Sequence, residues 1–137
     1  IIGAVLFRSA NTMDAMLGYK DERIRLGWFP ARMDDILAYI PARITGAVLL
    51  LIFLLKGRIK QAWYIFKHDR KSRPGFNGGI SMSLIAGGCG IMFEKPGVYQ
   101  IGYPEQTLEE GGKTIISTIR WCTVICAAIG MLLLIFI

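Results

Sequence analysis

The chain has 137 residues, of which 53% are hydrophobic, and its formal net charge is +6. This length suits one compact domain, but the hydrophobic share exceeds that of ordinary soluble proteins and indicates a bilayer as the solvent. We expect an all-α, polytopic integral membrane protein with interfacial helices and one further helix that could be re-entrant. The odd number of cysteines, three, excludes a complete disulfide framework. The positions of these cysteines and of the single histidine fit no four-ligand zinc pattern.

The chain opens on an apolar stretch, residues 1 to 7, that has neither an initiator methionine nor a basic leader. We interpret it as the tail of an earlier apolar helix, so that further residues are expected before it. From Arg8 to Tyr19 the pattern predicts an amphipathic helix with Asn11 and Asp14 on its polar stripe. Solvated helix surfaces favour Lys and Glu, so this stripe is a candidate site. A simple pairing of Asp14 with Arg8 is the structural alternative.

A second helix is expected from about Ala31, with Pro30 in its first turn, where the missing N–H of proline costs little. The 20 residues from 36 to 55 contain only Arg43 as a charge, which is enough apolar length for a membrane-spanning helix. Pro41 removes a backbone donor inside this run and should kink the helix there.

Charged side chains gather at the start of this apolar run. An ionised group loses several kcal/mol of hydration beside hydrocarbon unless it is paired or serves a site. Arg32 and Asp35 are three residues apart, and Asp35, Tyr39 and Arg43 repeat every four, so both a structural ladder of ion pairs and a ligand site fit the spacing.

A basic stretch follows, with seven Lys or Arg residues from Lys56 to Arg73 against the single Asp69. Beside a membrane span such a bias indicates the cytoplasmic side and attraction to anionic lipid. No nucleic-acid-binding motif accompanies it, so no nucleic-acid partner is expected. An apolar stripe within the stretch predicts a helix lying in the head-group region; it consists of Ile59, Ala62, Trp63 and Phe66.

The last third of the chain alternates apolar and turn-forming segments. Residues 80 to 93 are uncharged and suit a short or re-entrant helix that packs closely through its glycines. The glycines just before this run could hold phosphate, and structural packing explains them equally well. Residues 94 to 113 predict a loop or short hairpin, and Thr114 begins a closing helix. Residues 121 to 137 carry no charge and predict a second span, with a buried core helix as the alternative.

Three blocks of residues carry a likeness to one family: Asn11 to Met16 with Gly18 to Lys20; Arg32, Asp34-Asp35 and Ile40 to Arg43; and Asn77, Gly79, Met82, Ala86-Gly87 and Gly90. Together they resemble the membrane-bound cobinamide-phosphate synthases of cobalamin biosynthesis. Phe76 departs from the family pattern, which usually has proline directly before the asparagine. Family proteins are longer, so the resemblance implies that residues 1 to 137 are the C-terminal half of a single membrane-embedded synthase domain.

The resemblance implies an ATP-dependent ligase in the cytoplasmic membrane with its active site facing the cytoplasm. It would join adenosylcobyric acid by an amide bond to an aminoalcohol, commonly aminopropanol phosphate, and so give adenosylcobinamide phosphate. ATP and Mg²⁺ are the expected cofactors. The expected partners are the corrinoid, the aminoalcohol phosphate, membrane lipid and the N-terminal half of the same protein, with an oligomer left open.

Such a ligase screens phosphate charge with Mg²⁺ on carboxylates and with basic side chains. The expected Mg²⁺ ligands are Asp34 and Asp35, which with Asp14 form the expected catalytic set. The expected substrate- and phosphate-binding residues are Asn11, Lys20, Arg32, Arg43 and Asn77. One alternative is a transporter or channel component with Asp14, Asp35 and Arg43 along its path. Another is a regulatory membrane protein without chemistry.

Overall fold

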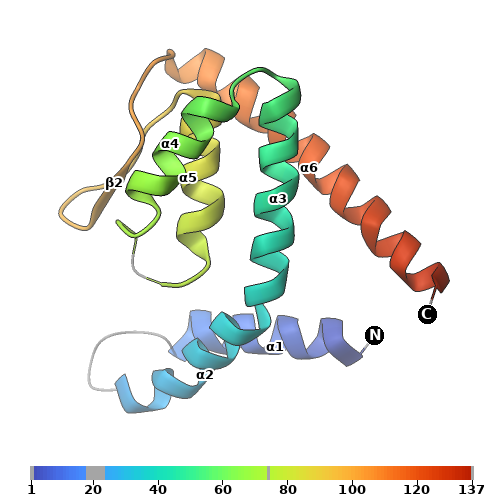
Figure 1. Cartoon of the computed structure of the whole chain (residues 1–137). Coiled ribbons are helices and arrows are strands. Elements are labelled where there is room, and N and C mark those ends of the chain that lie inside the picture. Colours follow the sequence, from blue (N-terminus) through green and yellow to red (C-terminus); the bar gives the residue numbers. More distant parts are fainter. Residues whose placement is uncertain (1, 18–23, 74, 137) are drawn as a thin grey trace. The chain divides into compact units, whose positions relative to one another are not determined.

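The computed structural model describes residues 2–17, 24–73 and 75–136. Its elements are α1 (Ile2–Leu17), α2 (Ile24–Leu37), α3 (Tyr39–Leu55), α4 (Ile59–Asp69), α5 (Gly78–Cys89), β1 (Phe93–Lys95), β2 (Tyr99–Ile101) and α6 (Leu108–Phe136) (Figure 1). The chain divides into two compact units, residues 1–41 and 42–137. The expected helical character is confirmed, and one two-stranded sheet is added to it.

The first unit is built from α1 and α2, which pack along each other. The prediction for the start of α2 was wrong, because this helix begins at Ile24 rather than near Ala31. Pro30 therefore lies inside the helix and not in its first turn. Pro30 is buried, so tertiary packing outweighs the local cost of a proline in a helix.

A break at Ala38 separates α2 from α3 and interrupts the expected helix over residues 36 to 55. In an uninterrupted helix the ring of Pro41 would clash with the carbonyl group of Leu37. The helix ends at that residue and restarts at Tyr39. Pro41 consequently lies in the first turn of α3, where a helix tolerates proline, and the expected kink takes the form of this earlier break.

One helix of the described residues is long and apolar enough to cross a membrane, namely Leu108–Ile135 within α6. A second span arises only if Trp28–Leu37 and Tyr39–Leu55 are counted together. Length and composition are the only grounds for both, so the expected polytopic arrangement stays a prediction. Only 11% of the most apolar window of α6 is buried, unlike the core helix of a soluble protein.

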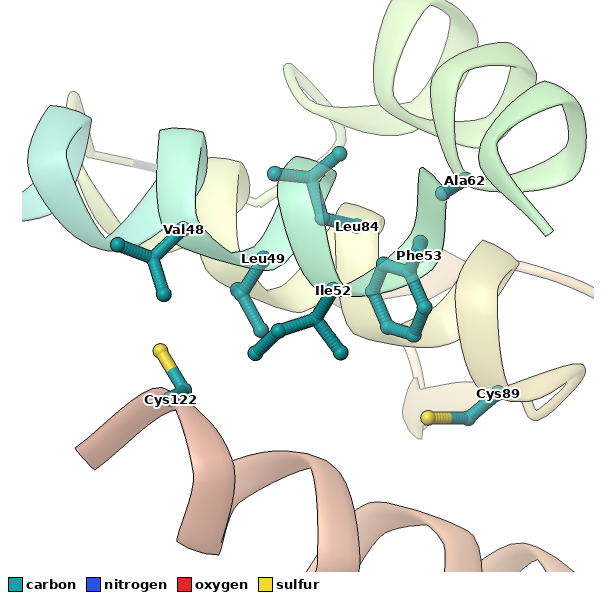
Figure 2. Close-up of a cluster of buried hydrophobic side chains, with 8 residues drawn as sticks. All are labelled: Val48, Leu49, Ile52, Phe53, Ala62, Leu84, Cys89 and Cys122. Carbon is teal, nitrogen blue, oxygen red and sulfur yellow. The ribbon is translucent and has the colours of Figure 1, made fainter. Parts of the chain in front are cut away.

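The second unit holds the main hydrophobic core. Side chains of α3 point toward α5 and α6 in Figure 2, and Phe53 and Leu49 are fully buried there. The buried members are Val48, Leu49, Ile52, Phe53, Ala62, Leu84, Cys89 and Cys122. This core joins α3, α4, α5 and α6 into the scaffold that carries part of the candidate site.

Glycines let α5 approach its neighbours closely, as the sequence predicted. A Cβ atom on Gly87 would lie 2.5 Å from the carbonyl oxygen of Gln61 and 2.8 Å from the Cα of Ala62, both in α4. A Cβ atom on Gly88 would overlap the ring of Phe53. The helix stops at Cys89 and not at residue 93, because Gly90 takes the left-handed conformation with φ +62°.

The apolar stripe predicted on α4 faces the protein in part. Ala62 of the stripe is buried, whereas Trp63 is 51% exposed. Because α4 packs on α5, the one small residue of the stripe, Ala62, serves helix packing. The exposed Trp63 remains available for the head-group contact that the sequence predicts.

Of the loop or short hairpin expected between residues 94 and 113, the structure has a hairpin of β1 and β2, which begins at Phe93. The two strands are antiparallel, with Phe93 opposite Ile101 and Lys95 opposite Tyr99. Ile101 is fully buried and packs in a smaller cluster with Ile65 of α4. The hairpin is therefore anchored to the α4–α5 pair.

The prediction that α6 begins at Thr114 was wrong, because the helix begins at Leu108. Thr107 and Glu110 stabilise this earlier start. The Thr107 hydroxyl donates to the Glu110 carboxylate at 3.0 Å and accepts from the Glu110 backbone N–H at 3.4 Å. This Thr-x-x-Glu arrangement is related to a capping box, and it outweighs the glycines that suggested a loop.

Burial raises the pKa of the Cys89 thiol above its ordinary value, and this desolvation outweighs the hydrogen bond with Thr118 and the nearby cations. Since the thiolate is the reactive form, we expect Cys89 to react slowly with a maleimide at neutral pH. The rate should rise with pH, but only above the range of an ordinary thiol. The measurement is mass spectrometry of the folded protein with Cys122 and Cys126 replaced by alanine. Denatured protein is the control, and rapid labelling of folded protein at neutral pH would contradict the expectation.

Candidate functional site

In the first unit, two of the predicted site residues meet across α1 and α2. The Asn11 side-chain amide donates to the Asp34 carboxylate, with 3.3 Å between Nδ2 and Oδ1. Asn11 is exposed and Asp34 is half-buried, as is the adjacent Asp35. Two sequence blocks that are 23 positions apart are thus brought into contact, with the amide orienting a carboxylate.

The other predicted site residues of this unit are Arg32, Asp14 and Lys20. Arg32 lies exposed on α2. Asp14 belongs to α1, but its side chain lies outside the described structure, and Lys20 lies outside the described residues. Their predicted roles therefore stay predictions.

Among the described residues, no group of three or more His, Cys, Asp or Glu side chains could hold a metal ion. Mg²⁺ is commonly held by one or two carboxylates together with substrate phosphates and water, so it does not need such a group. Asp34 and Asp35 supply two half-buried carboxylates on one helix. These donors fit Mg²⁺, and the metal role stays a prediction.

In the second unit, the structure brings together Arg43 and Asn77, both predicted to bind substrate. The Arg43 guanidinium donates to the Asn77 side-chain oxygen, with 3.0 Å between Nη1 and Oδ1. Asn77 stands at the N-cap of α5, yet its side chain makes no capping hydrogen bond. Its amide is used instead to position a cation from α3.

Arg43 also lines a cavity of about 500 Å³ in the second unit. The lining residues are Arg43, Arg70, Lys71, Arg73, Gly75, Phe76 and Ile80. Four of these seven are cationic and none is a carboxylate. Such a cavity can bind an anion, and phosphate oxygens suit Arg and Lys donors well.

Sequence reasoning missed three of these cations, since Arg70, Lys71 and Arg73 were interpreted as part of a lipid-facing basic stretch. The structure places them beside Arg43 in the wall of one cavity. Phe76, which departs from the family pattern, lines the same cavity.

Residues 1–131 match a family model described as CobD/Cbib protein. The chain belongs to the CobD/Cbib family. The family expected from the three blocks is therefore confirmed. In this family, the probable cobalamin biosynthesis protein CobD of Methanothermobacter thermautotrophicus is 47% identical over 104 residues, which cover 74% of this chain and 35% of that protein.

Two further CobD/Cbib relatives extend the comparison. The cobalamin biosynthesis protein CobD of Leptospira interrogans is 41% identical over 98 residues, covering 70% of this chain and 31% of that protein. The probable cobalamin biosynthesis protein CobD of Methanocaldococcus jannaschii is 40% identical over 102 residues, covering 73% and 33%. The matched residues thus cover about a third of the length of these relatives. No solved structure matches the chain.

Proposed function

We propose that this chain carries part of the active site of an ATP-dependent amide ligase in cobalamin biosynthesis. The reaction joins a carboxyl group of adenosylcobyric acid to the amine of an aminoalcohol phosphate, such as aminopropanol phosphate, and gives adenosylcobinamide phosphate. Family membership and the names of the relatives support a step in cobalamin biosynthesis. The observation that carries the site is the Arg43–Asn77 hydrogen bond at a cavity lined by cations.

The chemistry explains why such a site needs charge. An amine does not displace an oxygen of a carboxylate by itself, because that oxygen is a poor leaving group. ATP supplies the phosphoryl group with which this oxygen leaves as phosphate, while the amine nitrogen bonds to the carbonyl carbon. The phosphate oxygens must be held and their charge balanced while the amide bond forms. We assign this task to Arg43, with Asn77 fixing its guanidinium, and to Arg32 and Lys20 of the first unit.

In the proposal, the acidic residues of the first unit bind the metal ion. Magnesium, when bound, screens phosphate charge, and Asp34 and Asp35 are its proposed ligands. Asn11 would hold the Asp34 carboxylate in a fixed orientation through the 3.3 Å hydrogen bond. Asp14 on α1 belongs to the same proposed catalytic set.

We further propose that the protein lies in the cytoplasmic membrane with α6 as a span and the site on the cytoplasmic side. Exposed apolar side chains along α6 and the basic stretch after α3 support this placement. Lipid and the N-terminal half of the protein are then further partners, and an oligomer remains compatible with it.

The test uses the complete protein, purified in detergent. It is incubated with adenosylcobyric acid, ATP, Mg²⁺ and aminopropanol phosphate, and the amide product is sought by mass spectrometry. We expect product only when all components are present. Absence of product would contradict the proposal, and solute flux into vesicles without condensation would favour a transporter.

A further inference from the structure

The cavity that Arg43 lines holds three further cations, which the Arg43–Asn77 hydrogen bond does not explain. Arg43 comes from α3, Arg70 stands at the C-terminal cap of α4, and Lys71 and Arg73 lie in the turn that follows. Ile80 of α5 completes an apolar part of the wall. Positive charges from two segments are therefore gathered at one place.

Contacts with the protein hold these side chains at the cavity. The Arg70 guanidinium lies 5.3 Å from the centre of the Phe66 ring. The Arg73 guanidinium occupies the space where a Cβ atom of Gly78 would stand, at the start of α5. Any side chain at position 78 would displace it. Together with the bond from Arg43 to Asn77, these contacts position three of the four cations.

The carboxylate nearest in sequence does not face the cavity. Asp69 accepts a hydrogen bond from the backbone N–H of Gly102 at 2.8 Å, and its other oxygen lies 3.5 Å from Nδ1 of His68. Its charge is thus directed to the end of the β1–β2 hairpin. Like charges in one cavity repel each other, and a bound anion relieves this repulsion.

The charge pattern discriminates between the two phosphate-bearing substrates of the proposed reaction. An aminoalcohol phosphate carries an ammonium group, which a cavity lined by cations and no carboxylate would repel. A triphosphate carries several negative charges and no positive one. The volume of about 500 Å³ also exceeds what a single phosphate group fills.

We propose that Arg70, Lys71 and Arg73, together with Arg43, bind the triphosphate of ATP, and that the aminoalcohol phosphate binds elsewhere. This inference rests on the proposed ligase function and assigns one of its substrates to a defined cavity. It also gives the basic turn after α4 a role in substrate binding.

The experiment measures binding of ATP and of inorganic tripolyphosphate to the complete protein by calorimetry, without the corrinoid. Changing Arg70, Lys71 and Arg73 to glutamine should weaken binding of both probes at least about 100-fold, because several charge-assisted hydrogen bonds are lost. The matched control changes Lys60, Lys67 and Lys95 to glutamine. It removes the same charge from exposed positions outside the cavity, and should change binding less than about threefold.

Steady-state kinetics provide a second measurement. The cavity variant should raise KM for ATP and leave KM for aminopropanol phosphate unchanged. If the cavity variant instead raised KM for aminopropanol phosphate and bound ATP as the unaltered protein does, the inference would be overturned. Amide formation by the unaltered protein would still support the proposed ligase function. If the unaltered protein forms no amide but binds tripolyphosphate through these residues, the ligase proposal fails and the polyphosphate site stands.

Lipid binding and misfolding of the variants are each measured separately. Vesicles containing phosphatidylglycerol test a lipid head group as the source of phosphate, and a cavity variant that loses vesicle binding but keeps ATP binding would overturn the inference. Circular dichroism verifies the helical content of each variant. If the triple variant does not fold, Lys71→Gln alone is used, because this side chain is exposed; unchanged tripolyphosphate affinity would then count against the site.

Discussion

The Asp35→Asn variant is expected to form amide product at least about 100-fold more slowly than the unaltered protein, since it loses a proposed Mg²⁺ ligand. Asparagine keeps the size of the half-buried side chain and removes its charge. The rate should therefore fall while the helices persist. Product formation over time by mass spectrometry, with circular dichroism of the same sample, measures both quantities.

The matched control is Glu109→Gln, which removes one carboxylate charge on α6. Glu109 pairs with Lys113 at 2.7 Å, and its side chain is 79% exposed. An exposed pair of this kind contributes little to stability. The control should retain the full rate, and a folded Asp35→Asn variant that also retained it would exclude a metal role for Asp35.

The Gly87→Ala variant is expected to lose about 3 kcal/mol or more of stability, because overpacking against a rigid backbone cannot be relieved by a side-chain rotation. The added methyl group would lie 2.5 Å from the carbonyl oxygen of Gln61 and 2.8 Å from the Cα of Ala62. The α4 and α5 helices would have to separate. Thermal unfolding in detergent, followed by circular dichroism, measures the change.

A matched glycine on α6 gives the opposite expectation. A Cβ atom on Gly112 would meet no heavy atom within 4 Å. Alanine there should stabilise the helix by about 0.5–1 kcal/mol, because glycine loses more conformational freedom on folding. If both variants unfolded at the same temperature, the close α4–α5 contact would not determine stability.

Local patterns in the sequence were sufficient for several elements of the fold. Proline chemistry predicted an interruption near Pro41, and turn residues predicted a loop or short hairpin within residues 94 to 113, where β1 and β2 pair. Both features depend on residues close in sequence. The start of α2 at Ile24 could not be predicted in this way, since Gly27 and Pro30 lie inside the helix and both disfavour a helix interior locally.

The same distinction applies to the candidate site. The family likeness indicated Arg43 and Asn77, and the structure brings them together although they are 34 positions apart. The three cations after α4 had no comparable signal, because a basic stretch beside an apolar helix has the same composition whether it meets lipid or a ligand. Only their placement beside Arg43 around one cavity distinguishes these cases. The early start of α6 did have a signal, the Thr107–Glu110 spacing.

As a membrane span, α6 would be longer than the hydrocarbon core of a bilayer. Its 29 residues extend about 44 Å at ~1.5 Å per residue, whereas a hydrocarbon core is only ~30 Å thick. Glu109, Glu110 and Lys113 occupy its first turns, so this end would project into water. Thr118, which accepts a hydrogen bond from Lys56 at 2.9 Å, would then lie near the phosphate level of the lipid. A thinner bilayer would tilt the helix further and shift this anchoring point.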